Sequence, residues 1–159
     1  MTSSATDSEL VRKALFMAIT AHDGQHDRGG KPYILHPITV SMGVEGELAK
    51  AVALLHDVVE DTDVTIDQIR SEFGDEVADR VFLMTHEESM SYEQYVRRLS
   101  SDPVCRRVKL SDLAHNMDPA RLHNPGPKDY ERLEKYERAK RFLLAAEEGT
   151  DIEDYGRQI

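Results

Sequence analysis

A short, mostly apolar segment of the sequence ends directly in a histidine and three carboxylates, and no other feature constrains the fold as much. Residues 49–55 have the composition of a buried helix. If that helix continues, Asp57, Glu60 and Asp61 stand at positions i, i+3 and i+4 and share one face. Three carboxylates so close together repel one another, and a divalent cation removes the repulsion. With His56 beside them, the segment predicts a metal site at the end of a buried helix.

Two other segments place a metal-binding side chain among apolar residues. His36 directly precedes Pro37, where helical geometry is disfavoured, so we expect its side chain to cap a helix or face a cleft. Asp112 interrupts the apolar periodicity of residues 104–117, so an inward-facing carboxylate there requires a cation or hydrogen-bond donors. Together the three segments predict a ligand set of two imidazoles and two carboxylates: His36, His56, Asp57 and Asp112.

The donor types in this set restrict the choice of metal. Mixed nitrogen and oxygen donors suit manganese, iron or zinc better than calcium. Because the set contains no thiolate, a structural zinc site is disfavoured. The single cysteine, Cys105, falls within the apolar third segment, and we expect it to be a small buried hydrophobic residue.

Capping residues divide the chain into successive helices, and no segment shows the alternation of a strand. We therefore predict an all-α, single-domain fold over residues 1–159, with a core at about 7–146 and an acidic tail at 147–159. The first expected helices are one opened by a capping box at residues 6–9 and ending near 21, a short one starting at 36–37, and an apolar one over 47–60. They are followed by one opened by a capping box at 65–68 and ending at 73–74, one starting at 75, one opened by a capping box at 91–94, one starting at 102–103, and one over 130–146.

Charge and hydropathy exclude several classes of partner. The net charge is −10, from 20 basic and 30 acidic residues, which disfavours a nucleic-acid-binding surface. No apolar run approaches the roughly 20 residues of a membrane span, and the N-terminus lacks the pattern of a signal peptide. We expect a cytoplasmic protein without a membrane partner, and the sequence does not indicate its oligomeric state.

Five groups of residues follow one another between about residues 14 and 122, and their order resembles one family. They are Ala21-His22-Asp23-Gly24-Gln25, Pro32-Tyr33-Ile34 with His36-Pro37, Leu54-Leu55-His56-Asp57 with Glu60-Asp61-Thr62, Phe73-Gly74 with Val77, and Lys109-Leu110 with Asp112 and His115-Asn116-Met117. The chain is similar to the metal-dependent HD-domain phosphohydrolases, and within them to the hydrolase domain of the RelA/SpoT proteins and the small alarmone hydrolases.

This resemblance implies both a cofactor and a reaction. The cofactor would be one manganese ion, or another divalent transition metal, held by the four ligands named above within an all-helical fold. Glu60 and Asp61 would be the pair that activates water, although the sequence does not say which of them takes the proton. The reaction would remove the 3′-pyrophosphate from guanosine tetraphosphate or pentaphosphate (ppGpp or pppGpp).

The partner implied by the resemblance is a small phosphorylated nucleotide. The same resemblance implies that Asn116, Arg132 and Tyr136 contact it. A polyanionic substrate on an acidic chain also needs local cations, and Arg28 and Lys109 are candidates. We expect the other basic residues considered for this role to be ordinary surface charges: Lys31, Arg97 and Arg98.

Two departures from the family pattern bear on the substrate. Family members usually carry a basic pair where this sequence has Asp27-Arg28, and a basic residue where it has Leu113. These changes remove positive charge from the nucleotide-binding rim and leave the ligand set intact. The alternatives are therefore an HD-type hydrolase acting on a nucleoside monophosphate or another pyrophosphate, and a catalytically silent nucleotide sensor. Because the sequence ends at Ile159, we expect no synthetase domain and hydrolysis as the only reaction.

The remaining histidines and one serine have separate expectations. His22 and His115 are equally compatible with orienting a metal ligand and with bonding a backbone carbonyl. Ser111 precedes Asp112 but lacks the turn of a nucleophilic serine, which makes covalent catalysis the weaker hypothesis. Three histidines lie among polar residues and are expected at the surface: His26, His86 and His123.

Overall fold

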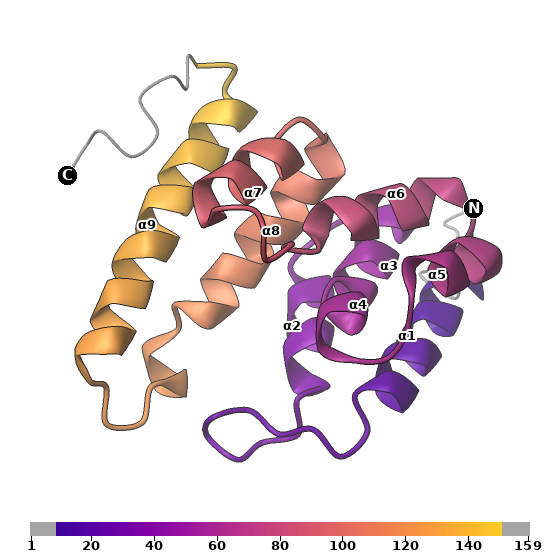
Figure 1. Cartoon of the computed structure of the whole chain (residues 1–159), viewed down its shortest axis with the longest axis horizontal. Coiled ribbons are helices and arrows are strands. Elements are labelled where there is room, and N and C mark those ends of the chain that lie inside the picture. Colours follow the sequence, from indigo (N-terminus) through magenta and orange to yellow (C-terminus); the bar gives the residue numbers. More distant parts are fainter. Residues whose placement is uncertain (1–8, 151–159) are drawn as a thin grey trace, which may run out of the picture.

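The computed structural model describes residues 9–150, and within this range the chain forms helices joined by loops (Figure 1). Within the described range, β pairing is confined to one isolated bridge between His26 and Pro32, so the expected all-α fold is confirmed. None of the helices described has the length and apolarity needed to cross a membrane. The helices are α1 Glu9–Ala21, α2 Leu35–Met42, α3 Glu47–Leu55, α4 Val58–Asp61, α5 Ile66–Phe73, α6 Asp75–Met84, α7 Tyr92–Leu99, α8 Pro103–Asn116, the 3₁₀ helix η1 Pro119–Arg121, and α9 Pro127–Glu147.

Local capping interactions start several helices where the sequence predicts them. Thr65 and Ser91 each accept a hydrogen bond from the backbone amide three residues later, and these capping boxes open α5 and α7. Asp102 accepts from the amides of Val104 and Cys105 at 2.9 and 3.0 Å, so α8 begins as predicted. The capping box expected at residues 6–9 falls largely outside the described residues.

The last helix begins three residues earlier than the sequence analysis predicted. It starts at Pro127, whose missing N–H is no loss in the first turn of a helix. Asp129 accepts a hydrogen bond from the amide of Gly126 at 2.8 Å and caps this new start. The predicted start at residue 130 is wrong because the last proline of the Pro-Gly-Pro segment opens the helix and does not break it.

The prediction of one continuous helix over residues 47–60 is also wrong. Helix α3 ends at Leu55, a turn follows at His56 and Asp57, and the short helix α4 starts at Val58. Asp57 lies at φ −103° and ψ −3°, away from regular helix geometry. The three carboxylates of this segment are therefore not stacked on one uninterrupted helix face.

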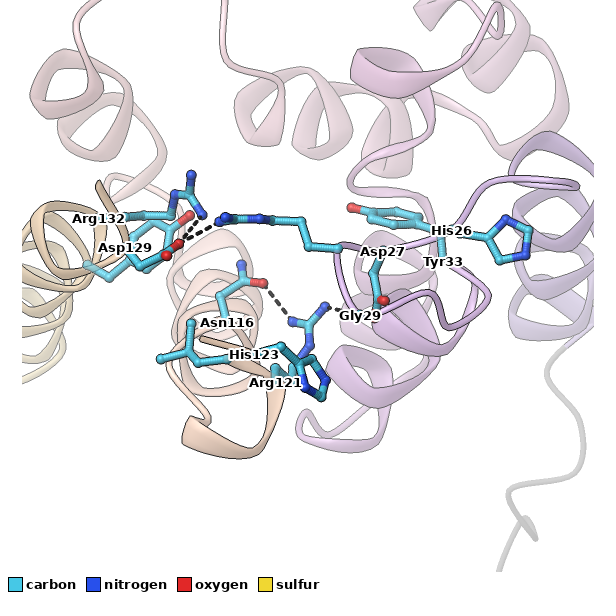
Figure 2. Close-up of a pocket in the computed structure, with 12 residues that line it drawn as sticks. His26, Asp27, Gly29, Tyr33, Asn116, Arg121, His123, Asp129 and Arg132 are labelled. Atoms are coloured by element: carbon cyan, nitrogen blue, oxygen red, sulfur yellow. Dashed lines mark hydrogen bonds and ion pairs between the residues drawn. The ribbon is translucent and has the colours of Figure 1, made fainter. Parts of the chain in front are cut away.

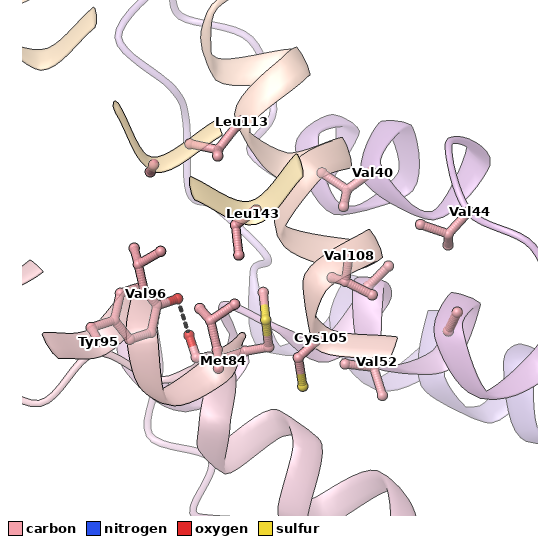
Figure 3. Packing of buried hydrophobic residues seen from close by; sticks show 14 of the residues in the cluster. Val40, Val44, Val52, Met84, Tyr95, Val96, Cys105, Val108, Leu113 and Leu143 are labelled. Atoms are coloured by element: carbon pink, nitrogen blue, oxygen red, sulfur yellow. Dashed lines mark hydrogen bonds between the residues drawn. The ribbon is translucent and has the colours of Figure 1, made fainter. Parts of the chain in front are cut away.

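Helix α3 lies between two hydrophobic clusters and is buried on almost every side. Its residues Ala49, Val52 and Ala53 belong to the cluster that α3 shares with α2 and α6–α9, shown in Figure 3. Its residues Ala51, Leu54 and Leu55 pack instead with α1 and α4–α6. Figure 1 shows α9 at one end of the molecule and α1 and α5 at the other, with α2, α3 and α8 between them. The turn that follows α3 is consequently in the interior.

Candidate metal centre

The four predicted ligands come from three elements and meet in the interior. His36 lies on α2, His56 and Asp57 form the turn after α3, and Asp112 lies on α8. His36, His56 and Asp112 are 4%, 2% and 4% exposed. His36 is the second residue of α2 and not a residue outside it, so the expected non-helical geometry before Pro37 is wrong. The α conformation is disfavoured before proline but not forbidden, and here the helix begins at Leu35.

The donor atoms lie at distances that fit one ion. His36 Nε2 is 2.9 Å from Asp112 Oδ1 and 3.6 Å from Asp57 Oδ2. His56 Nε2 is 3.0 Å from Asp57 Oδ2 and 3.4 Å from Asp112 Oδ1. Donors about 2.1 Å from one ion lie roughly 3 Å from each other, so these spacings match a coordination shell. The structure thus brings the predicted ligand set together, and binding of an ion by it stays a prediction.

Both imidazoles present the nitrogen that a metal would require. His56 Nδ1 donates to the carbonyl oxygen of Ala53, which leaves Nε2 as the atom that faces the carboxylates. Among the described residues, this buried Nε2 has no aligned hydrogen-bond partner. A buried imidazole nitrogen that faces two carboxylates without an aligned hydrogen bond can serve as a metal ligand, so the residues fit a divalent metal.

The carboxylates make the centre strongly attractive to a cation. Burial lowers the pKa of His56, but Asp57 and Asp112 outweigh it and raise that pKa well above its ordinary value. Burial raises the pKa of Asp57, but His56 outweighs it and lowers the pKa to about 2. The two carboxylates thus favour positive charge between them, as a proton on His56 or as a metal ion in its place.

Asp112 is held by two residues that the sequence analysis predicted as substrate contacts. Lys109 is 7% exposed, and its Nζ donates to Asp112 Oδ2 at 2.8 Å while lying 5.1 Å from the ring centre of Tyr95. Asn116 Nδ2 donates to Asp112 Oδ1 at 3.0 Å. Because Lys109 is buried in this pair, its ammonium group holds Asp112, and a contact with the substrate stays a prediction.

Tyr33 is a residue of the centre that the predicted ligand set does not include. Its hydroxyl donates to Asp57 Oδ2 at 2.5 Å, on the same oxygen that faces the imidazoles. Burial and the Asp57 carboxylate raise the pKa of Tyr33, so the phenol keeps its proton at neutral pH. The sequence signal that could have identified Tyr33 is its position in the Pro32-Tyr33-Ile34 motif, but that motif does not indicate what the side chain does.

His115 contacts the outer nitrogen of a predicted ligand. Its Nδ1 is 2.7 Å from His36 Nδ1 and 3.2 Å from Arg121 Nη1. Burial, with Arg121 and His36 nearby, lowers the pKa of His115 to about 4, so this imidazole is neutral at pH 7. Since Arg121 can only donate, His115 Nδ1 is an acceptor, and His36 Nδ1 carries the proton between the two rings. Of the two roles considered for His115, the structure supports the orientation of His36.

Glu60 and Asp61, the predicted water-activating pair, lie on α4 directly after the turn. Glu60 Oε1 accepts from the backbone amide of His86, which fixes its carboxylate. Burial is the main cause that raises the pKa of both groups, and Asp57 raises both further. A carboxylate with a raised pKa is a better proton acceptor, which is the property that a general base needs.

A pocket of about 380 Å³ adjoins the centre and contains most of the predicted substrate contacts (Figure 2). Tyr33 and Asn116 belong to both the pocket and the centre. Lys109 is absent from the lining, and Arg121, which no sequence signal indicated, is part of it. The predicted contacts that line the pocket are Arg28, Asn116, Arg132 and Tyr136.

The other histidines divide between interior and surface. His22 is buried, its Nδ1 bonds Gln25 Oε1 at 2.8 Å, and its ring lies 4.9 Å from that of Tyr33, which bonds Asp57. Its Nε2 has no hydrogen-bond partner among the described residues, so the alternative of a bond to a backbone carbonyl is wrong. His86 is half-buried, stacks on Tyr95 with ring centres 4.9 Å apart and bonds the carbonyl of Met90, so its expected surface position is wrong. Three further expectations are confirmed: exposed His26, exposed His123 and buried Cys105.

Comparison with known proteins relates both the sequence and the fold to one group. A family model described as HD domain matches residues 14–147. A probable GTP pyrophosphokinase of Mycobacterium leprae is 35% identical in an alignment of length 130 that covers 73% of this chain and 16% of that protein. A guanosine-3′,5′-bis(diphosphate) 3′-pyrophosphohydrolase of Aquifex aeolicus is 33% identical in an alignment of length 123 that covers 69% of this chain and 18% of that protein. This chain thus spans less than a fifth of the length of either relative.

A solved structure shares the arrangement of helices. It is described as a metazoan orthologue of SpoT that hydrolyses ppGpp, and it is 25% identical to this chain. The match has a TM-score of 0.74 and covers 93% of this chain and 90% of the other. The likeness therefore extends over nearly the whole length of both chains.

Proposed function

This chain belongs to the HD-domain family, and we propose that it is a metal-dependent phosphohydrolase that removes the 3′-pyrophosphate of ppGpp or pppGpp. One observation carries the proposal. Two imidazoles and two carboxylates converge at 2.9–3.6 Å beside a pocket lined by arginines and tyrosines. The names of the Aquifex relative and of the matched solved structure support the choice of substrate.

The proposed cofactor is manganese, within a site whose chemistry suits a divalent transition metal. His36, His56, Asp57 and Asp112 would hold it, since mixed nitrogen and oxygen donors without thiolate favour such an ion. When bound, the ion would acidify water and offset the negative charge of the phosphoryl oxygens. Lys109 and Asn116 keep Asp112 in its orientation, and Tyr33 does the same for Asp57.

The proposed reaction assigns separate tasks to the carboxylate pair and to the pocket. Water attacks the phosphorus next to the 3′ oxygen, and Glu60 or Asp61 takes the proton from that water. The bond between phosphorus and the 3′ oxygen breaks, the oxygen leaves with the electron pair, and a proton from solvent restores the hydroxyl. The products are GDP and pyrophosphate when ppGpp is the substrate. The pocket beside the centre would hold the nucleoside and its 5′-phosphates.

The proposed partner is a small phosphorylated nucleotide in the cytoplasm, and not a nucleic acid. The net charge of −10 supports this choice because a nucleic acid would meet a predominantly acidic surface. A small nucleotide needs only the local cations of the pocket, which Arg28, Arg121 and Arg132 supply.

Incubation of the full chain and manganese with a panel of nucleotides tests the proposal. The panel contains ppGpp, pppGpp, nucleoside monophosphates and other pyrophosphates, and the released phosphate and pyrophosphate are measured separately. We expect pyrophosphate and GDP from ppGpp, and no release by the Asp112→Asn variant.

Two results would contradict this assignment. Cleavage of another nucleotide with ppGpp left intact would point to an HD-type hydrolase of different specificity. Tight binding of ppGpp without release of any product would point to a silent sensor.

A further inference from the structure

Each arginine that lines the pocket lies within 4 Å of a carboxylate that also lines it. Arg28 Nη1 lies 2.6 Å from Asp129 Oδ1, and Arg132 Nη1 lies 3.6 Å from the same oxygen. Arg121 Nη2 lies 3.7 Å from Asp27 Oδ2. Figure 2 shows Asp129 and Arg132 on α9, opposite the loop that carries Asp27 and Gly29. Each arginine available to an anionic ligand therefore already faces a carboxylate.

Asp129 is the fixed member of this cluster, and the two arginines are the movable members. Its side chain is 9% exposed, whereas those of Arg28 and Arg132 are 70% and 42% exposed. Asp129 Oδ2 accepts from the amide of Gly126, which ties the carboxylate to the first turn of α9. The Gly126 amide and Arg28 lower the pKa of Asp129, so the group is ionised at neutral pH. A ligand can thus draw the arginines away but cannot displace the carboxylate.

The pair between Arg28 and Asp129 joins two walls of the pocket that are 101 residues apart in sequence. Arg28 belongs to the loop between α1 and α2, and Asp129 belongs to α9. Tyr33 and Asn116 connect the same pocket to the candidate metal centre. A nucleotide with its 3′-phosphates at that centre would extend its remaining phosphates toward the Arg28 and Arg132 side chains.

We propose that Asp129 is an internal competitor for Arg28 and Arg132, and that it lowers the affinity of the pocket for the phosphates that are not hydrolysed. This inference rests on the proposed function for the orientation of the nucleotide. Each phosphate that binds the arginines must first separate them from Asp129, and it then lies near a fixed negative charge. The carboxylate makes binding of the diphosphate product weaker, which favours its release.

Calorimetric titration of the full chain with GDP and with inorganic pyrophosphate tests the role of Asp129. The variant Asp129→Asn removes the charge but keeps an oxygen that can accept from Gly126. We expect it to bind both ligands about three- to tenfold more tightly than the unaltered chain, with a smaller gain at high salt. Binding of guanosine, which has no phosphate, should not change.

The control variant is Glu147→Gln, at the other end of α9. It changes the net charge by the same amount and breaks a pair of the same length, since Glu147 Oε1 lies 2.6 Å from Arg106 Nε. We expect its affinity for GDP and pyrophosphate to equal that of the unaltered chain. A gain as large as that of Asp129→Asn would mean that net charge alone is responsible, and the proposal would be wrong.

A double variant and a second substitution complete the test. Arg28→Met combined with Asp129→Asn should lose most of the gain in affinity. If Asp129→Asn proves unstable, Asp129→Ser takes its place in the test, because its hydroxyl can also accept from the Gly126 amide. We expect the same gain in affinity from it. Unchanged or weaker binding of both ligands by folded Asp129 variants would overturn the proposal. If Asp129→Asn gains affinity for pyrophosphate but the unaltered chain does not hydrolyse ppGpp, the proposed function is wrong and the role of Asp129 still holds.

Discussion

At the scale of single residues, hydrogen bonds to the outer imidazole nitrogens decide which atoms face the candidate metal centre. His56 donates through Nδ1 to a backbone carbonyl, and His36 donates through Nδ1 to His115. Each bond fixes the tautomer and the plane of its ring, which leaves Nε2 directed at the carboxylates. The neutral state of His115 is necessary for this arrangement because an imidazolium there would have no lone pair to offer His36.

Replacement of His115 by alanine tests its orienting role. Without the acceptor, His36 loses the bond that holds its ring, so we expect the affinity for manganese to fall about tenfold or more. The dissociation constant is measured by titration of the metal-free protein. His123→Ala, which removes an exposed histidine, should leave that constant unchanged. Equal affinities in the two variants would exclude the orienting role.

Separate substitutions of Glu60 and Asp61 distinguish proton transfer from metal binding. Glu60→Gln and Asp61→Asn keep the shape of each side chain and remove its basicity. We expect turnover to fall by roughly two orders of magnitude or more in at least one variant, with the metal content unchanged. Loss of metal from both variants would make the two residues ligands, and unchanged turnover in both would remove them from the mechanism.

The pH profile of turnover provides a further readout for the same pair. A general base acts only when it is deprotonated, so activity should fall as the pH drops through its pKa. Because burial raises the pKa of Glu60 and of Asp61, that fall should occur above the ordinary carboxyl values of 4.5 and 3.8. The variant that removes the base should lose this acidic limb.

At the scale of helices, α8 positions Asp112 and begins at an N-cap that the sequence alone predicts. Asp102 accepts from two backbone amides at the start of this helix and also pairs with Arg80 at 3.2 Å. The cap and the following proline fix the first turn, and the register of the helix then carries Asp112 to the interior. A local interaction thus contributes to the position of a residue almost three turns away.

Removal of this cap should lower the stability of the protein and leave the predicted metal ligands in place. We expect Asp102→Ala to lower the free energy of unfolding by about 1 kcal/mol or more, measured by urea denaturation. Asp102→Asn keeps an acceptor for the two amides and should lose less. Equal losses in the two variants would show that the ion pair with Arg80, and not the cap, supports this end of α8.

At the scale of the whole molecule, the candidate centre joins elements that are far apart in sequence. His36, the turn at His56 and Asp57, and Asp112 meet because α2, α3 and α8 pack on one another around a shared core. An ion bound there would connect all three elements and would be absent from the unfolded chain. Metal binding should therefore contribute to global stability as well as to activity.

Thermal unfolding with and without manganese tests this contribution. At a metal concentration of about 100 times the dissociation constant, the stabilisation is roughly 2.7 kcal/mol, which corresponds to a rise of about 5–10 °C in Tm. A chelator should reverse the rise, and Asp112→Asn should abolish it together with the bound metal. Asp67→Asn, at an exposed carboxylate on α5, should keep the full shift. The same shift in both variants would place the ion elsewhere.

The helical class, several helix starts and the identity of the ligand candidates could all be predicted from the sequence. A helix cap joins residues that are two or three positions apart, so Thr65, Ser91 and Asp102 can form their caps independently of the tertiary structure. The ligand candidates were recognisable because a charged or imidazole side chain inside an apolar segment requires a partner. Both signals involve residues that are close together in the sequence, so they can be recognised before the fold is known.

The contacts that these groups make depend on the packing of helices that are distant in sequence. The turn at His56 and Asp57 interrupts a segment of helical composition, although Leu55 before it and Val58 after it pack in the same hydrophobic cluster. Lys109 points inward because Asp112 and two tyrosine rings surround its ammonium group. The pairing of Arg28 with Asp129 was not predictable, since its energy depends on a separation in space across 101 residues of chain. Electrostatic and packing energies depend on distance in the folded molecule, and sequence spacing fixes that distance only within a helix or a turn.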